Sequence, residues 1–343
     1  MELRFHKPNP GIDDQIATLM NLAGIDANRD IVRELIIGSL KYAQDARDRG
    51  DLKMMNTTIK EMRYTAKVFG PYQDRYKVTV FGSSRTRPDT PLYNMAVRFA
   101  RQVVEKGFMV ITGGGPGIME AANKGAGPEN SFGATIKLPF EQTTNEIVAS
   151  NPRMIQYKYF FNRKVAFIKE THAIALFPGG FGTMDEAMEA MTLVQTGKRN
   201  PIPIVFLETK RDTYWDRWME FMQNYLVKDG YLPPTDVDLV TIRSDEKEAV
   251  KVITTFYRRY HSMRYVGDVV VLRLKTRPTE RMIRVLNEEF SKDLLPGGSF
   301  EARGPLPEEE DEPKLLDLPR IIFPFNKKCF PSLKAIIERV NSF

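Results

Sequence analysis

Short apolar runs alternate with amphipathic segments between residue 77 and about residue 260. The apolar runs have the length of buried strands, and the segments between them carry apolar residues at helical spacing. Strands are predicted at residues 78–81, 108–112, 134–138, 173–177, 202–207 and 238–242. Helices are predicted at residues 91–105, 161–170 and 215–227, and also from residue 118, from the glycine-rich turn after 177 to about 196, and from residue 246. This alternation predicts an α/β fold with a doubly wound parallel sheet.

The two ends of the chain follow other patterns. Residues 1–75 lack a strand signal, and their apolar spacing predicts an N-terminal helical extension. After residue 260 a small C-terminal α+β extension is predicted, with strands at 269–274 and 320–325 and helices at 278–290 and 333–340. The predicted domains are therefore residues 1–75, 76–260 and 261–343.

Two further segments of this region have a distinctive composition. Residues 307–313 form an acidic run bounded by prolines, which is interpreted as a solvated loop. Residues 257–265 mix basic and aromatic side chains. They fit an anionic effector pocket or a nucleic-acid surface, but the solvated end of a helix with its tyrosines in the core is the favoured interpretation.

The overall charge agrees with an anionic small ligand. The chain has 343 residues, of which 42% are hydrophobic and 27% charged, and its net charge is +6. This composition can bury a sizeable core. The mild basicity suits nucleotides and falls short of the basic signature of a nucleic-acid-binding protein, so nucleic acid is disfavoured as a partner.

Cysteine and histidine are scarce. The single cysteine, Cys329, excludes an intrachain disulfide, and three widely spaced histidines disfavour a zinc site. No apolar run approaches the roughly 18–20 residues that span a bilayer, and the N-terminus lacks the apolar segment of a signal peptide. We expect no metal, no membrane association and a cytoplasmic location.

Glycine-rich or serine-rich loops follow three of the predicted strands. Residues 82–85 read Gly-Ser-Ser-Arg, residues 112–117 read Thr-Gly-Gly-Gly-Pro-Gly, and residues 178–183 read Pro-Gly-Gly-Phe-Gly-Thr. Each of the last two opens a predicted helix, whose free N–H groups and positive dipole end suit a phosphate. Because such sheets bind ligands beyond the carboxyl ends of their strands, the loops predict a phosphate site there.

Simpler interpretations of these residues remain open. The first glycine loop is neither a Walker A motif nor the usual dinucleotide fingerprint, and it can be a tight turn without a ligand. Thr183 can cap the helix that follows it or offer its hydroxyl to a phosphate. Asp185 and Glu186 can complement the helix dipole in the first turn, whereas Glu186 can also reach into the pocket.

These motifs resemble the lysine-decarboxylase-like (LONELY GUY) family. The resemblance is carried by Gly-Gly-Gly-Pro-Gly-Ile-Met-Glu-Ala-Ala-Asn at 113–123, Asn-Arg-Lys at 162–164 and Pro-Gly-Gly-Phe-Gly-Thr-Met-Asp-Glu at 178–186. It covers roughly residues 77–260 and implies a Rossmann-like domain that binds nucleoside 5′-monophosphates. Characterised members are phosphoribohydrolases that activate cytokinins and bacterial nucleotide 5′-monophosphate nucleosidases, so the implied substrate is a nucleoside monophosphate and the implied cofactor is none.

The resemblance also implies roles for single residues. Arg163 and Glu186 match the family's catalytic arginine and glutamate, and Glu120 is implied to contact a ribose hydroxyl. The residues that match the substrate-binding loops are Ser84, Gly114, Gly115, Gly117, Gly180, Gly182 and Thr183. Asp185 stands where the plant-type motif has glutamate, so the base preference stays open.

The residue types fit the implied chemistry. Cleavage of a ribosyl–base bond develops positive charge at C1′, which a carboxylate such as Glu186 can stabilise while it positions or deprotonates water. Arg163 suits a phosphate through its paired donors, or it can donate to the departing base.

Three functions compete. The first is hydrolysis of the N-glycosidic bond of nucleoside 5′-monophosphates to free base and ribose 5-phosphate, and the second is a nucleotide-binding regulatory or carrier protein on the same fold. The third, a single-strand DNA-binding protein of the DNA-processing type, is disfavoured by the lack of a basic groove pattern. The presence of both Arg163 and Glu186 favours the hydrolase, and the family resemblance implies a homo-oligomer.

Overall fold

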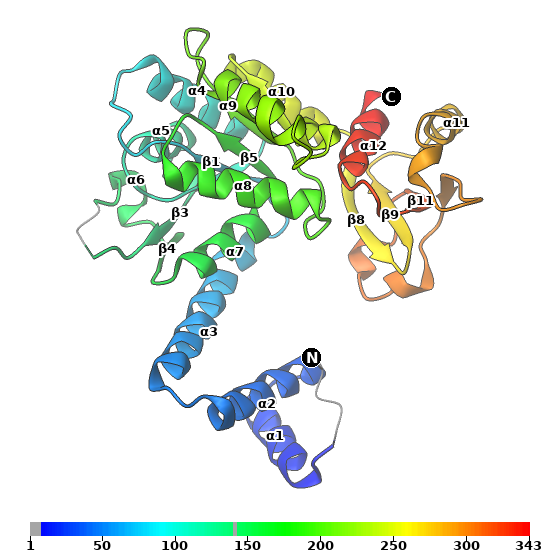
Figure 1. Cartoon of the computed structure of the whole chain (residues 1–343). Helices are drawn as coiled ribbons and strands as arrows, with labels where there is room; N and C mark the ends of the chain where they lie inside the picture. The colour runs from blue at the N-terminus through cyan, green and yellow to red at the C-terminus, as the bar shows by residue number, and fades with distance from the viewer. Residues whose placement is uncertain (1–7, 140–142) are drawn as a thin grey trace. The chain divides into compact units, whose positions relative to one another are not determined.

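The computed structural model describes residues 8–139 and 143–343 (Figure 1). The chain divides into two compact units, Met1–Tyr64 and Thr65–Phe343. Within the described ranges, no helix combines the length and apolar character needed to cross a bilayer. The division predicted from the sequence, at residues 75/76 and 260/261, stays a prediction.

The smaller unit is helical. It contains α1 (Pro10–Leu22), α2 (Arg29–Asp45) and the first part of α3 (Arg49–Phe69). The side chain of Asn9 caps α1 by accepting a hydrogen bond from Ile12 N. An ion pair of 2.7 Å between Arg33 and Asp13 joins α2 to α1.

The larger unit contains a seven-stranded parallel sheet. Its strands are β1 (Lys77–Phe81), β2 (Met109–Thr112), β3 (Ser131–Ile136), β4 (Met154–Tyr157), β5 (Ala173–Leu176), β6 (Ile204–Leu207) and β7 (Val240–Arg243). They pair in the order β4-β3-β2-β1-β5-β6-β7, so the chain winds outward from β1 to β4 and then from β5 to β7. The doubly wound α/β fold predicted from the sequence is confirmed. Its strand order reverses between β1 and β5, which is where such sheets bind ligands.

Helices cover both faces of this sheet (Figure 1). They are α4 (Pro91–Glu105), α5 (Ile118–Ala126), α6 (Glu146–Ala149), α7 (Phe160–Glu170), α8 (Phe181–Gln195), α9 (Tyr214–Phe221) and α10 (Glu246–Phe256). Ala173 and Ala175 of β5 belong to the apolar cluster with α4, α5 and α10, whereas Ile174 and Leu176 belong to the cluster with α7, α8 and α9. Because both faces are buried, the strands are apolar at successive positions.

Some elements of this sheet and its helices differ from the prediction. The strand β4 was not predicted, because it is four residues long and half exposed, so it lacks the fully apolar composition of the other strands. The strand β3 begins at Ser131 rather than at residue 134, because Ser131 pairs with Val110. The helix predicted over residues 215–227 is α-helical to Phe221 and continues as the π-helical segment Met222–Val227.

A second sheet follows α10. It is antiparallel in the order β10-β11-β9-β8, with strands β8 (Tyr260–Val266), β9 (Val269–Leu274), β10 (Glu301–Arg303) and β11 (Arg320–Pro324) and helices α11 (Glu280–Glu289) and α12 (Pro331–Ser342). The interpretation of residues 257–265 as the end of a helix is wrong, because α10 ends at Phe256 and β8 begins at Tyr260. The part that placed tyrosines in the core is right, since Tyr257 and Tyr260 are both buried.

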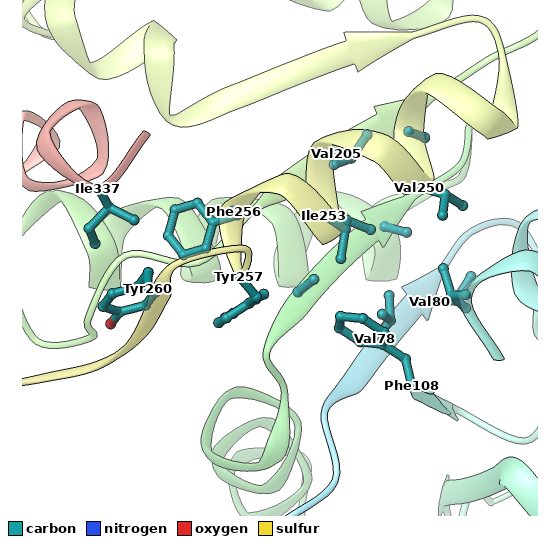
Figure 2. Packing of buried hydrophobic residues seen from close by; sticks show 14 of the residues in the cluster. Val78, Val80, Phe108, Val205, Val250, Ile253, Phe256, Tyr257, Tyr260 and Ile337 are labelled. Carbon is teal, nitrogen blue, oxygen red and sulfur yellow. The ribbon is translucent and has the colours of Figure 1, made fainter. Parts of the chain in front are cut away.

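The two sheets share one apolar cluster. Figure 2 shows side chains of the parallel sheet (Val78), α10 (Ile253 and Phe256) and α12 (Ile337) within it. Tyr257 is buried beside them, and its hydroxyl donates to the backbone oxygen of His172. The C-terminal sheet is therefore packed on the parallel sheet through a continuous core.

The acidic segment 307–313 is mostly exposed, as the interpretation as a solvated loop expects, but that interpretation fails for Glu309, which is buried. Arg273 and Arg320 are direct neighbours on β9 and β11, and both are buried. Glu309 is 0% exposed and accepts hydrogen bonds of 2.9 Å from the Nε atoms of both arginines. Two buried guanidinium groups need an anionic partner, which explains why an acidic run folds onto this sheet.

We predict that Glu309→Ala lowers the free energy of unfolding by about 3–5 kcal/mol, because it leaves two buried arginines without their shared carboxylate. Urea denaturation measures the change. Glu310→Ala removes the same charge from an exposed neighbour and is expected to change stability by less than about 0.5 kcal/mol. Equal stabilities of the two variants would contradict the structural role of Glu309.

Candidate functional site

The three predicted loops meet at one edge of the parallel sheet. They follow β2, β1 and β5, which are adjacent strands. Ser83 joins all three, because its N–H donates to Pro178 O at 3.1 Å and its carbonyl accepts from Ile118 N at 3.1 Å. Gly117 has a φ of 69°, and a Cβ atom there would overlap the backbone of Ser83 and Ser84. Only glycine permits this close approach of two loops.

A network of buried hydrogen bonds supports the first glycine-rich loop, residues 112–117. Thr112 Oγ1 donates to Asn123 Oδ1 at 2.7 Å and accepts from Gly114 N at 2.9 Å. Asn145 Nδ2 donates to Gly115 O at 3.0 Å and to Asn123 Oδ1 at 3.1 Å. The supporting role of Asn145 was not predicted from the sequence, because a lone asparagine in a polar stretch has no pattern that distinguishes it from a surface residue.

The loops open onto a cavity of about 650 Å³. Among the residues assigned from the sequence, the cavity is lined by Ser84, Arg163, Gly180, Gly182, Thr183 and Glu186. Its apolar wall consists of Phe81, Met119, Ile136, Leu138, Phe160, Phe167 and Met184. The lining therefore combines a glycine-rich, polar set of residues with apolar side chains, as ligand sites commonly do.

Four residues assigned to the substrate lie outside this lining. Gly114, Gly115 and Gly117 belong to the loop that supports residues 83 and 84, and of this loop the cavity lining includes only Gly113. Glu120 accepts a hydrogen bond of 3.0 Å from the hydroxyl of Tyr93. The structure thus gives these four residues contacts within the protein and does not bring them to the cavity.

The second glycine loop ends at the N-terminus of α8. Gly180 is the N-cap residue and α8 has no side-chain cap, so the expectation that Thr183 caps this helix is wrong. Thr183 lies in the first turn instead, against Gly179, where a Cβ atom would overlap its hydroxyl oxygen. The uncapped N–H groups and the positive end of a four-turn helix suit an anion.

Arg163 of α7 and Glu186 of α8 meet at the cavity. Arg163 Nη2 lies 4.0 Å from Glu186 Oε1, and the side chains are 15% and 5% exposed. Glu186 lies in the second turn of α8, one turn later than predicted. Arg163 Nε and Glu186 Oε2 are buried and have no hydrogen-bond partner within the described residues. Buried polar atoms of this kind are expected to bind water or a ligand.

Burial shifts the pKa of both groups toward their neutral forms. It lowers the pKa of the Arg163 guanidinium and raises the pKa of the Glu186 carboxyl to about 7, although the positive charges of Arg163 and Lys164 oppose the latter shift. Lys164 forms ion pairs with Asp185 at 2.7 Å and Glu189 at 3.1 Å. Asp185 therefore helps to join α7 to α8, which is more than the dipole interaction considered from the sequence.

The residues described here include no group of three or more His, Cys, Asp or Glu side chains that could hold a metal ion. His172 lies outside the cavity, beneath Tyr76 and Tyr257. Its Nδ1 accepts from Lys77 N at 3.3 Å, and burial lowers the pKa of His172 to about 3. This histidine is thus a neutral acceptor in the packing around β1.

The fold and the cavity define a doubly wound α/β protein with an anion-suited site at its strand-order reversal. The family model described as "Possible lysine decarboxylase" matches residues 117–253, a segment that contains Arg163 and Glu186. Cytokinin riboside 5′-monophosphate phosphoribohydrolase LOG3 of Arabidopsis thaliana is 24% identical over 184 residues, which are 52% of this chain and 82% of the relative. Probable cytokinin riboside 5′-monophosphate phosphoribohydrolase LOGL3 of Oryza sativa subsp. japonica is 26% identical over 168 residues, 48% and 76% of the two chains. These matches confirm the resemblance of the α/β domain to the lysine-decarboxylase-like (LONELY GUY) family.

Solved structures match about half of the chain. The molybdenum cofactor carrier protein of Chlamydomonas reinhardtii aligns with 20% identity and a TM-score of 0.38, over 52% of this chain and 96% of its own. DNA processing protein A of Helicobacter pylori aligns with 16% identity and a TM-score of 0.37, over 53% and 82%. Alignments at this level carry no functional argument, and the fold assignment depends on the strand order.

We predict that Glu186→Gln stabilises the protein at neutral and alkaline pH. In the unfolded chain a glutamate ionises near 4.5, whereas in the folded protein Glu186 ionises near 7. Wild-type stability therefore falls as pH rises from 4.5 to 7, because only the unfolded state releases the proton. Glutamine avoids this loss, which is about 3 kcal/mol above pH 7.

Thermal denaturation across pH 4.5–8.5 checks the sign. The melting temperature of Glu186→Gln is expected to match the wild type near pH 4.5 and to exceed it by a constant amount above pH 7. Glu129→Gln, at an exposed position, is the matched control for loss of one negative charge. A Glu186→Gln protein that is less stable than wild type at pH 8 would show that the ionised carboxylate stabilises the fold.

Proposed function

We propose that this protein hydrolyses the N-glycosidic bond of nucleoside 5′-monophosphates and releases the free base and ribose 5-phosphate. The observation that carries this proposal is the buried pair of Arg163 and Glu186, which lines the same cavity as the open N-terminus of α8 and keeps Nε and Oε2 without a partner in the described residues. This reaction needs a group that binds the phosphate and a carboxylate that is shielded from water, both in one cavity. The family resemblance supports the same activity.

The phosphate is proposed to bind at the start of α8. There the N–H groups of the first turn and the positive helix end attract an anion, and Ser84 lines the same cavity. The base is proposed to lie against the apolar wall, where an exposed aromatic side chain such as Phe160 can contact a flat ring. The ribose then bridges the two sides and brings its anomeric carbon toward Glu186.

The reaction exchanges one bond at C1′ for another. The bond from C1′ to the base nitrogen breaks with its electron pair going to the base, and the bond from C1′ to the water oxygen forms. The ionised carboxylate of Glu186 stabilises the positive charge that develops on the ribose and accepts a proton from the attacking water. The base leaves with a proton, which the protonated Glu186 returns.

Arg163 has two roles open to it. Its guanidinium can donate to the departing base or bind the phosphate, and both roles use a buried donor that the protein itself leaves unpaired. Cation–π contacts hold the Arg163 guanidinium in place. Its Cζ atom lies 4.9 Å from the centre of the Phe160 ring and 5.6 Å from that of the Phe167 ring. In either role Arg163 is held close to the carboxylate that it partly neutralises.

We predict that the protein releases free base from at least one of AMP, GMP, IMP, CMP and UMP, and that Glu186→Ala reduces turnover about a hundredfold or more. Chromatography of the reaction mixtures measures free base and ribose 5-phosphate. Glu129→Ala, at an exposed position, is expected to retain full activity. Tight binding of a monophosphate without cleavage would instead favour the carrier function, and full activity of Glu186→Ala would remove Glu186 from the mechanism.

We also predict that kcat/KM rises with pH to a plateau, with its midpoint near pH 7. The carboxylate acts in its ionised form, and burial raises the pKa of Glu186 to about 7, so activity is lost as pH falls below that value. The phosphate of the substrate ionises near pH 6, and calorimetric binding of ribose 5-phosphate over the same pH range separates its contribution. A rate that is flat or falls between pH 6 and 8 would exclude this role of the carboxylate.

A further inference from the structure

Both carbonyl groups at the start of the second glycine loop are bonded to donors of the protein. Pro178 O accepts from Ser83 N at 3.1 Å, and Gly179 O accepts from the hydroxyl of Tyr214 at 2.6 Å. Tyr214 comes from α9, which follows this loop in the chain after the helix α8 and the strand β6. A site for an anion must turn its carbonyl oxygens away, because they repel negative charge as strongly as N–H groups attract it.

The bond from Tyr214 fixes the orientation of one particular peptide group. The peptide between Gly179 and Gly180 is trans, so its N–H and its carbonyl point in opposite directions. With Gly179 O bound to Tyr214, the Gly180 N–H points away from Tyr214. Because both residues are glycine, their backbone dihedral angles can change at low cost and the peptide can rotate if this bond is lost.

We propose that Tyr214 is a positioning residue for phosphate binding, which keeps the Gly179 carbonyl bonded to its own hydroxyl and the Gly180 N–H, on the opposite side of the same peptide, available to the anion. The inference rests on the proposed function, because it assumes that the start of α8 receives the phosphate of the substrate. Gly179, Gly180 and Tyr214 all line the cavity. Tyr214 acts through the loop and takes no part in the bond changes at C1′.

The position of the Tyr214 hydroxyl is itself fixed by buried contacts. Glu208, which follows β6 and is 3% exposed, accepts a hydrogen bond of 2.8 Å from Trp215 N. Trp215 is fully buried, and its Nε1 donates to Leu207 O at 3.2 Å. The ring of Tyr214 packs edge-on against Trp215 with centroids 4.8 Å apart. These hydrogen bonds attach the start of α9 to the end of β6. They therefore fix the position from which the Tyr214 side chain contacts Gly179.

Loss of the hydroxyl is expected to affect phosphate binding more than chemistry. Without its donor, the Gly179 carbonyl can rotate into the cavity, where it removes one N–H from the anion site and adds a repulsive oxygen. Arg163 lies on α7 and Glu186 lies in the second turn of α8, so both side chains are expected to keep their geometry. The predicted signature is a rise in KM with little change in kcat, which is the pattern for lost binding of the unreacting part of a substrate.

The experiment compares Tyr214→Phe with the wild type in calorimetric binding of ribose 5-phosphate and in steady-state hydrolysis. The variant is expected to bind ribose 5-phosphate about tenfold more weakly and to raise KM by a similar factor, with kcat within about twofold. Tyr225→Phe, at an exposed tyrosine of the following π-helical segment, is the matched control and is expected to behave as wild type.

Hydrogen exchange of the peptide that contains residues 178–184 provides a second measurement. Ribose 5-phosphate is expected to slow exchange there in the wild type, and the effect is expected to be weaker in Tyr214→Phe. If the wild type neither binds ribose 5-phosphate nor cleaves monophosphates, the proposed function itself fails. If the wild type binds it and Tyr214→Phe binds it equally well, or loses kcat alone, the role of Tyr214 is overturned while the proposed function stands.

Discussion

Ser83 carries the interaction on which the geometry of the site depends. Its peptide N–H binds the loop after β5 and its carbonyl binds the start of α5, so one residue joins the ends of three adjacent strands. Hydrogen bonds between backbone groups at 3.1 Å cannot be formed unless the loops approach within contact distance, which Gly117 and Gly179 permit. The glycine-rich sequence of this region is therefore first a packing requirement, and the cavity is the space that this packing leaves.

The cavity contains a pair of charges that does not benefit the fold. Arg163 and Glu186 are 4.0 Å apart, beyond hydrogen-bond distance, and each keeps a buried polar atom without a partner in the described part of the chain. A carboxylate with its pKa raised to about 7 destabilises the folded protein at neutral pH. By contrast, the buried Glu309 is fully bonded to two arginines and supports the C-terminal sheet. The difference separates a charge placed for structure from one available to a ligand.

Sequence patterns predicted the parts of the molecule that follow periodic rules. The parallel sheet and its helices were predicted because both faces of each central strand are buried, which gives apolar runs such as residues 173–176. The edge strand β4 and the burial of Glu309 were not predicted, since both depend on partners distant in the sequence. Arg163 and Glu186 were named from motifs and the structure brings them together. Asn145 and Tyr214 instead support the loops through hydrogen bonds that no local pattern encodes.

The two glycine loops show why similar sequences need not have the same role. Each follows a strand and opens a helix, and from the sequence both suit a phosphate equally well. In the structure the first N–H of α5 is already bonded to Ser83 O, and the cavity reaches only Gly113 of that loop and Met119 within the helix. The loop before α8 instead has its carbonyls turned to Ser83 and Tyr214, and its glycines line the cavity. An anion is therefore better accommodated at α8, because there the protein has satisfied the loop's acceptors and left the helix end open.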